Sequence, residues 1–305
     1  LRSQTEDGYR ASHEVLFSAA DAAIPVYEQM LAAGDHRPEV YLYLGSTYGL
    51  KARVALAGKR WTSVVYSGLK GLRLIRKAHQ ADSSLTDAYL PLGVFDYYTG
   101  VSSMPVQILA RMFGIRPDRQ IGIAELDRAV REARYAWIEA ASTLSILYLY
   151  IEDNPAEAMR YTKKLLVRYP ENYYFSFLYG EALVHLGRLA EAREFLPRLR
   201  QLTGNSHPNQ QLEWTLKLAT LEASLALAEG DTATALSRVQ WVTENYEMEF
   251  DWHLGIAYYI RGMISEAQGQ PAGAAADYRA VIRLDNHTHF VNKAAGRLAD
   301  LRSRL

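Results

Sequence analysis

The sequence contains no cysteine among its 305 residues. Disulfide bonds and thiolate metal sites are therefore excluded, whereas the compartment stays open. No apolar run reaches the length of about 18 residues that a membrane-spanning helix requires. Net charge is also absent, because 34 basic residues balance 34 acidic ones. This balance argues against a global binder of polyanions, so no nucleic-acid partner is expected, although a local charged patch is not excluded.

Motifs for catalysis and cofactor binding are missing as well. The Gly58-Lys59 pair lacks the upstream glycine and the following Ser/Thr of a phosphate-binding loop. No Gly-x-Ser-x-Gly elbow and no paired-carboxylate motif stands out. His287 and His289, with Asp285 nearby, lack the spacing of a zinc site on a helix, and we interpret them as a solvated loop. We therefore expect no catalytic residue, no metal site and no cofactor, and hence not an enzyme.

What the sequence does contain, along nearly its whole length, is the helical spacing of apolar residues. Short breaks separate the helices, and some carry their own start signal. Asn154 can cap the exposed amides of the helix that follows it, and Pro155 fits the first turn. The predicted helices span residues 9–33, 38–57, 60–81, 86–98, 119–133, 137–151, 155–168, 173–186, 189–202, 209–228, 232–245, 251–268, 271–284 and 289–302.

A helical hairpin with the same pattern of small residues recurs along the chain. Small residues occupy matching positions, where two helices can approach closely; they are Gly45, Gly93, Gly180 and Gly262 on first helices and Ala158, Ala192, Ala235 and Ala274 on second helices. Ala158 and Ala192 are 34 residues apart, which is the period of a tetratricopeptide repeat. We predict an all-α, tetratricopeptide-like right-handed superhelix of about six or seven antiparallel helix pairs, forming one continuous domain over residues 1–305.

One predicted pair is interrupted by an insertion at about residues 99–118. Its middle, from Val106 to Phe113, is apolar and long enough for two helical turns, while Gly100, Pro105 and Pro117 break the helix near its ends. An apolar insertion of this length needs a surface to cover it. We expect it to lie in the concave groove of the superhelix or in a seam beside it, where it would either block the groove or line it.

The segment from Phe113 to Leu126, FGIRPDRQIGIAEL, resembles the signature of one tetratricopeptide branch. In that branch a glycine and an apolar residue precede Asp-Arg, and a second Gly-apolar pair follows. The branch includes the eukaryotic thirty-nine-type tetratricopeptide-repeat proteins, the fungal inclusion-clearance proteins and bacterial relatives; the segment from Asp87 to Tyr98 is similar to the bacterial ones. The resemblance covers roughly residues 40–190. It implies a bacterial scaffold or adaptor and supplies no catalytic residue.

Three residues around the insertion form a predicted structural latch. Asp118 is expected to cap the helix that begins after Pro117, with Arg119 in the first turn. Asp96 lies among large apolar residues, and a buried carboxylate needs a partner, for which Arg119 or Arg116 is suitable. The alternative is an Asp/Arg pair that binds a ligand.

A basic run without any acid lies between Glu39 and Asp82. It contains Lys51, Arg53, Lys59, Arg60, Lys70, Arg73, Arg76 and Lys77. Lys70, Arg73 and Lys77 share one helical face. The functional interpretation is a patch for an acidic protein or an anionic membrane surface; the alternative is a solvated helix balanced by acids elsewhere in the fold.

Aromatic residues suggest a ligand groove, since the chain has 21 tyrosines and tyrosine suits peptide recognition. Aligning the repeats predicts that Tyr97, Tyr98, Tyr150, Tyr174, Phe177, Glu181, His185, Tyr259 and Met263 face the concave groove. The alternative is that these side chains pack beneath the insertion and the adjacent helices. The set lacks the Lys/Asn/Arg clamp for a peptide carboxylate, which disfavours chaperone-tail recognition.

The leading functional prediction is a non-catalytic scaffold that binds a protein segment or an apolar ligand in this groove. Two alternatives remain: an adaptor that uses the basic patch, and an assembly subunit whose groove is filled by its own insertion. The oligomeric state is undetermined. The chain starts at Leu1 without methionine, so the compartment is expected to be cytoplasmic, or exported if a leader has been removed.

Overall fold

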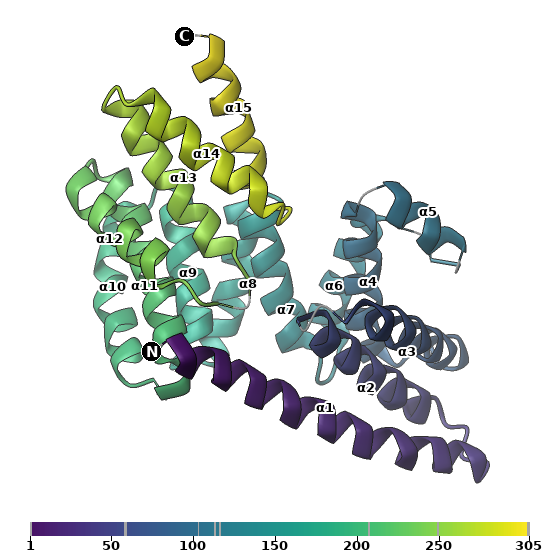
Figure 1. Cartoon of the computed structure of the whole chain (residues 1–305). Helices are drawn as coiled ribbons and strands as arrows, with labels where there is room; N and C mark the ends of the chain where they lie inside the picture. Colours follow the sequence, from purple (N-terminus) through teal and green to yellow (C-terminus); the bar gives the residue numbers. More distant parts are fainter. Residues whose placement is uncertain are drawn as a thin grey trace. The chain divides into compact units, whose positions relative to one another are not determined.

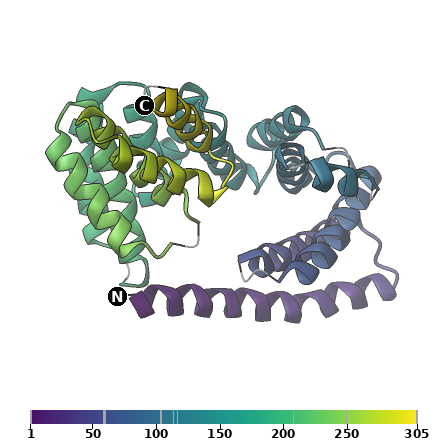
Figure 2. The same ribbon diagram turned by 45° about the horizontal axis from the view of Figure 1, so that its top comes forward.

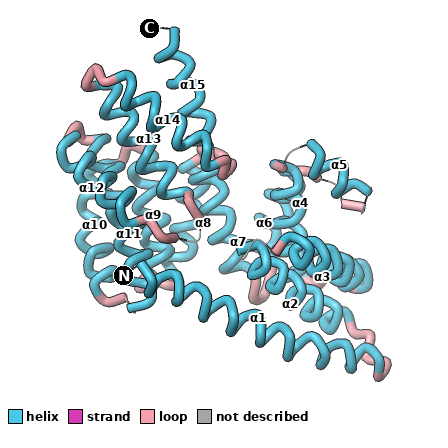
Figure 3. Tube along the Cα trace, in the orientation of Figure 1, coloured by secondary structure: helices cyan, strands magenta, loops and turns pink. Residues whose placement is uncertain are grey.

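The computed structural model of the chain describes residues 2–57, 60–102, 104–112, 114–115, 117–206, 208–248 and 250–303. Within these ranges every regular element is a helix, and short loops join the helices (Figure 3). The prediction of an all-α fold is therefore confirmed. Five residues named above lie outside the described ranges: Leu1, Gly58, Lys59 of the basic patch, and Phe113 and Arg116 of the signature.

The chain divides into two compact units. We call Tyr9–Leu144 the N-terminal unit and Ser145–Leu305, together with Leu1–Gly8, the C-terminal unit. Each unit has apolar clusters of its own, with Leu72 and Leu92 in the first unit and Leu178 and Leu221 in the second. The expectation of one continuous domain stays a prediction.

The N-terminal unit is built from two tight helix pairs and the helices around them (Figure 1). Its elements are α1 (Arg2–Ala32) from Tyr9 onward, α2 (Pro38–Ala57), α3 (Trp61–Ala81), the 3₁₀ turn η1 (Thr86–Ala88), α4 (Tyr89–Val101), α5 (Met104–Met112), α6 (Arg119–Glu132) and α7 (Trp137–Ile146) as far as Leu144. Helix α2 packs along α3, and α4 packs along α6. A Cβ on Gly93 of α4 would stand 2.8 Å from the Gly122 carbonyl oxygen of α6. The missing side chain is thus what lets these two backbones approach.

The C-terminal unit is an antiparallel series of helices whose colours run from teal to yellow in Figure 2. It contains the π-helical turn η2 (Leu147–Ile151), α8 (Pro155–Arg168), α9 (Tyr173–His185), α10 (Leu189–Gly204), α11 (Pro208–Ala228), α12 (Thr232–Asn245), α13 (Trp252–Ala267), α14 (Pro271–Leu284) and α15 (His289–Ser303). Each helix packs on the next one, and α11 also packs on α9 and on α13. Helix α15 returns to contact η2, so the first turn and the last helix of the unit meet.

Local signals in the sequence set the helix ends in this unit. The Asn154 side chain accepts a hydrogen bond from the Glu157 N–H (3.3 Å), with Pro155 in the first turn of α8. Asp231 caps α12 in the same way through the Thr234 N–H (3.0 Å). Such caps satisfy amides that have no partner inside the helix. The predicted boundaries of α8 and α14, 155–168 and 271–284, agree with the structure.

Two regions differ from the predictions. Helix α1 begins at Arg2, earlier than expected, and the helix predicted over 137–151 changes to π geometry from Leu147. The turn after it places Asp153 at φ 52°, a left-handed conformation that is uncommon for aspartate.

Candidate functional site

The predicted groove residues fall into both units. Tyr97 and Tyr98 are on α4 of the N-terminal unit, where Tyr97 is buried and Tyr98 is 39% exposed. The remaining seven belong to the C-terminal unit: Tyr150 is in η2, Tyr174, Phe177, Glu181 and His185 are in α9, and Tyr259 and Met263 are in α13. The seven therefore come from η2 and from two helices that both pack on α11 in the interior of the C-terminal unit.

Aromatic packing fills part of this interior. Tyr150 and Phe177 are both buried, and their rings lie 5.6 and 5.4 Å from the ring of His253, which is also buried. Lys217 covers the Tyr174 ring at 4.8 Å. This burial favours the packing alternative for Tyr150 and Phe177, because a ligand could reach them only after other side chains had moved. Groove binding by the other members stays a prediction.

A polar cluster lies deeper in the same unit. Glu181 and His185 are four residues apart on α9, with 3.6 Å between Glu181 Oε2 and His185 Nε2, which is too long for a hydrogen bond. His289, the first residue of α15, has its Nε2 3.5 Å from Asp153 Oδ1. One ligand-type atom from each of Asp153, His185 and His289 lies within 4.8 Å of the other two.

Burial controls the charges in this cluster. It raises the pKa of Glu181 to about 8, so the carboxyl group is mostly protonated at neutral pH. Burial, reinforced by the Lys293 charge, lowers the pKa of His185 to about 4 and also lowers that of His289, and both imidazoles are then neutral. Burial is the largest single effect on Asp153 and would raise its pKa, but the hydrogen bond from Lys293 and the electrostatic effects of His289, Lys293 and His185 together outweigh it, and the pKa is lowered.

Sequence reasoning missed this cluster. It examined His289 only with His287 and Asp285 and interpreted the three as a solvated loop. In the structure His287 is exposed, whereas His289 is 7% exposed and points to Asp153, far away in the sequence. The i, i+4 spacing of Glu181 and His185 was the one available local signal, because it places two polar side chains on the same face of a helix.

The predicted latch is present in part. Asp118 caps α6, accepting hydrogen bonds from the Gln120 and Ile121 N–H groups at 2.8 and 3.0 Å. The cation beside Asp96 is Arg76 of α3, whose Nη2 lies 3.8 Å from Asp96 Oδ1. Sequence reasoning had proposed Arg119 or Arg116, because it considered only cations close in sequence. Arg76 was not considered, since only the packing of α3 on α4 brings it there.

A second carboxyl group joins this ion pair. Burial raises the pKa of Glu125 on α6 to about 7; the nearby Asp96 adds to the shift and Arg76 opposes it. Burial likewise raises the pKa of Asp96, again against the effect of Arg76. Arg76 also donates a hydrogen bond from Nη1 to the Gly114 carbonyl (2.8 Å). The Arg76 guanidinium group therefore links Asp96 of α4 to the Gly114 backbone at the end of the insertion.

The insertion forms helix α5 and remains largely uncovered. Four of its apolar side chains are exposed: Met104 (62%), Val106 (45%), Ile108 (52%) and Met112 (78%). Its anchors are Ala110 and, just beyond the helix, Ile115, both part of a buried cluster with α3 and α4. The expectation that the insertion is covered inside a groove is thus wrong for this stripe of residues.

The basic patch is partly neutralised within its own unit. Lys51 forms an ion pair with Asp21, and Lys70 binds Glu28 at 3.0 Å, both acids being on α1. Lys77 lies 4.1 Å over the Tyr41 ring and Arg60 lies 4.3 Å over the Phe17 ring. Arg53 and Arg73 are exposed. These contacts favour the alternative of a helix balanced by acids elsewhere in the fold.

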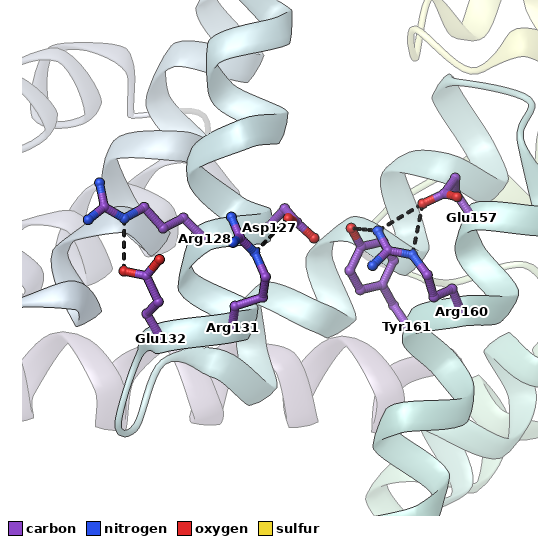
Figure 4. Close-up of polar contacts among 7 residues, drawn as sticks. All are labelled: Asp127, Arg128, Arg131, Glu132, Glu157, Arg160 and Tyr161. Carbon is purple, nitrogen blue, oxygen red and sulfur yellow. Dashed lines mark hydrogen bonds and ion pairs between the residues drawn. The ribbon is translucent and has the colours of Figure 1, made fainter.

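Other charges pair along single helices. The pairs drawn in Figure 4 are Arg128 with Glu132 (2.9 Å), Arg131 with Asp127 (3.0 Å) and Arg160 with Glu157 (2.9 Å). Pairs with this spacing on a solvated face contribute only about 0.2–0.5 kcal/mol each. They are therefore surface features and do not mark a site.

Comparisons with known proteins support the repeat assignment. The tetratricopeptide-repeat family matches residues 149–212 and again residues 220–289. A tetratricopeptide repeat protein from Parabacteroides merdae is similar in structure, with a TM-score of 0.52 and 15% identity over 93% of this chain and 98% of that one. Among curated proteins, none matches the chain.

More distant structures include the C-terminal part of a tetratricopeptide-repeat protein from Cytophaga hutchinsonii, with a TM-score of 0.44 and 13% identity over 94% of this chain and 98% of that one. Yeast Tom70 has a TM-score of 0.46 and 11% identity over 94% of this chain and 60% of that one. The fold and the two repeat matches define a helical-repeat scaffold protein. The chain contains tetratricopeptide repeats, which belong to a class that generally mediates protein interactions.

The described helices also bear on the membrane question. None of them combines the length and the apolar character needed to cross a bilayer.

Proposed function

We propose that this protein is a non-catalytic scaffold that binds a segment of another protein through the exposed face of α5. The observation that carries the proposal is the stripe formed by Met104, Ile108 and Met112, which are 52–78% exposed. Residues spaced by four lie above one another on a helix, so the three side chains form one continuous apolar surface. Exposed apolar surface of this kind is typical of interaction sites.

The helix that carries this stripe is held in place by its opposite side. Gln107 Nε2 donates to the carbonyl oxygens of Gly100 (3.0 Å) and Ser102 (2.9 Å). Ala110 is buried in the cluster that α3 and α4 form. A helix fixed in this way loses little entropy when a partner binds, which favours affinity.

The chemistry of the face indicates the partner. Methionine adapts its shape to different apolar surfaces and is common where a protein accepts helical peptides. Helix α5 contains no acidic residue, and its exposed Arg111 lies next to Ile108 and Met112 on the helix surface. We therefore expect an amphipathic helical segment with bulky apolar side chains and at least one flanking Asp or Glu.

This proposal places binding at the insertion and not in the predicted groove. The groove members Tyr150, Phe177 and Glu181 are buried by their own unit, which leaves the α5 face as the larger accessible apolar surface of the two. A charge-driven adaptor is less well supported, because Lys51 and Lys70 already pair with acids of α1. A role as an assembly subunit remains a prediction.

The test is a peptide selection from a random library displayed on phage, with the full chain as bait. Selected peptides are then titrated by fluorescence anisotropy against the wild type and against Met104→Gln/Ile108→Gln/Met112→Gln. We expect apolar, acid-flanked sequences that bind the triple variant at least tenfold more weakly. Val167→Gln is the matched control, since Val167 on α8 is 87% exposed. Selected peptides that bind the wild type and the triple variant equally well would contradict the proposal.

A further inference from the structure

The polar cluster of the C-terminal unit joins three separate parts of its fold. Asp153 lies in the turn between η2 and α8, His185 ends α9, and His289 begins α15. The loop before α15 is itself fixed, because Asn286 accepts hydrogen bonds from the Thr288 N–H (3.2 Å) and hydroxyl (2.8 Å) and donates one to Asp251 (2.8 Å). His289 therefore lies between a loop that these hydrogen bonds fix and the helix α15 that it begins.

We propose that Asp153, His185 and His289 form a three-ligand binding site for a divalent transition-metal ion of the Zn²⁺ type. Two imidazoles and carboxylate oxygens are a donor set that zinc accepts in proteins. The site is separate from the α5 face, so neither proposal depends on the other.

The distances suit this assignment. Zinc bonds of about 2.0–2.1 Å at tetrahedral angles place ligand atoms about 3.3 Å apart. His289 Nε2 and Asp153 Oδ1 are 3.5 Å apart. The three atoms from Asp153, His185 and His289 are all within 4.8 Å of one another.

Unpartnered buried atoms point to a missing ligand. Neither ring nitrogen of His289 and neither carboxyl oxygen of Glu181 has a hydrogen-bond partner among the described residues. The contact of His289 with the Leu149 backbone falls outside the limits of a hydrogen bond. Glu181 is fully buried and His289 is 7% exposed, and leaving such groups without a partner destabilises the folded state. A cation held by Asp153, His185 and His289 would give the His289 ring a partner.

Lys293 is the group that opposes metal binding. Its Nζ lies 2.9 Å from Asp153 Oδ2, and both side chains are more than 40% exposed. An exposed ion pair of this kind stabilises a fold only weakly. The ammonium group can turn to solvent at small cost, whereas the two imidazoles, which are largely buried, cannot leave. The metal is therefore expected to displace Lys293 from Asp153.

The site has a structural meaning for the unit. Its ligands come from the turn before the first complete repeat, from α9 and from the last helix. A metal ion there would fix the contact between η2 and α15 and so close the helical series on itself. Binding to the folded state alone would stabilise that state in proportion to metal concentration. We infer that the metal ion has a structural role, and no reaction is assigned to the site.

The experiment uses the full-length chain after metal removal by a chelating resin. Co²⁺ is titrated and followed by visible absorption, and Zn²⁺ affinity is measured by calorimetry. We expect one equivalent of Co²⁺ with the intense bands of tetrahedral coordination, displaced by Zn²⁺. His289→Gln and Asp153→Asn should weaken Zn²⁺ binding at least 100-fold, and Lys293→Met should tighten it about tenfold.

His287→Gln is the matched control, since His287 is exposed and two residues from His289. Circular dichroism establishes that each variant is folded, and Lys293→Met gives a readout in which binding improves. Weak octahedral Co²⁺ spectra, or equal losses in His287→Gln and His289→Gln, would overturn the site. An unchanged affinity in Lys293→Met would overturn the displacement of Lys293.

Discussion

The ring of Tyr278 on α14 occupies the space that a side chain on Gly262 of α13 would need. A Cβ at Gly262 would stand 2.7 Å from Tyr278 Cε1. The ring cannot move away easily, because Tyr278 is fully buried and its hydroxyl donates to Glu266 Oε2 at 2.8 Å. Sequence reasoning had placed a glycine at this close approach between the helices of a pair, and the structure identifies the side chain that it accommodates.

Gly262→Ala is accordingly expected to destabilise the C-terminal unit, even though alanine favours helix. The clash must push α13 and α14 apart, at a cost of about 1–3 kcal/mol. Urea unfolding followed by circular dichroism measures the change. Gly296→Ala on α15 is the control, since nothing lies within 4 Å of its Cβ; it should be neutral or up to about 1 kcal/mol stabilising. Equal effects of the two substitutions would show that the close approach does not matter.

Phe177→Ala tests whether the inner face of the C-terminal unit is core or groove. Phe177 is 1% exposed and packs with Tyr173 and His253. Its truncation should cost about 3–5 kcal/mol of unfolding free energy. Tyr98→Ala, at a side chain that is 39% exposed, should cost much less. A Phe177→Ala protein with near wild-type stability would instead indicate a solvated groove.

The Glu125 carboxyl predicts a pH dependence in the N-terminal unit. Its pKa is about 7 when folded, against 4.5 as the ordinary value. Between these pH values the folded state holds a proton that the unfolded state has lost, so the unfolding free energy falls as pH rises and the penalty is complete above about pH 7. The raised pKa of Asp96 acts in the same direction.

Glu125→Gln removes this penalty, because the amide carries no charge to bury beside Asp96. The variant should exceed the wild type by roughly 1–3 kcal/mol at pH 8 and match it near pH 4. Denaturant unfolding at a series of pH values provides the comparison. Parallel stability profiles for the two proteins would argue against a buried, strained carboxylate at this position.

Asp118→Ala examines the cap of α6. The carboxylate accepts two backbone hydrogen bonds at the start of the helix, so its loss should cost about 0.5–2 kcal/mol. Asp118→Asn should recover most of the stability, since asparagine caps as well as aspartate does. Thermal unfolding distinguishes the three proteins, and a failure of asparagine to recover stability would mean that charge, and not capping, is what Asp118 supplies.

Much of the fold could be predicted from the sequence because the signals are local. Asn154 with Pro155 starts α8, and Asp231 starts α12, through bonds to amides three residues away. The small residues Gly93 and Gly262 mark close helix crossings, since bulk there is excluded whatever the detailed packing. The spacing of small residues also predicted the tetratricopeptide class, because it too can be read from the sequence without knowing the tertiary contacts.

The contacts between distant residues could not be predicted in this way. Asp96 was matched with arginines near it in sequence, yet its ion pair is with Arg76 of a different helix. The insertion was expected to be covered, but only Ala110 and Ile115 among its named members are buried, and the Met104–Met112 stripe is not. Periodicity identifies an apolar side chain without showing which surface, if any, lies against it.

By itself the sequence determined the helical class, the positions of most helix ends and the repeat that stacks them, because hydrogen-bond caps and side-chain size act within a few residues. The tertiary structure alone decided that Phe177 is core, that Ile108 is exposed and that His289 meets Asp153 and His185. Small changes in crossing angle add up over successive helix pairs, so the meeting of the first turn and the last helix of the C-terminal unit depends on all the packing between them.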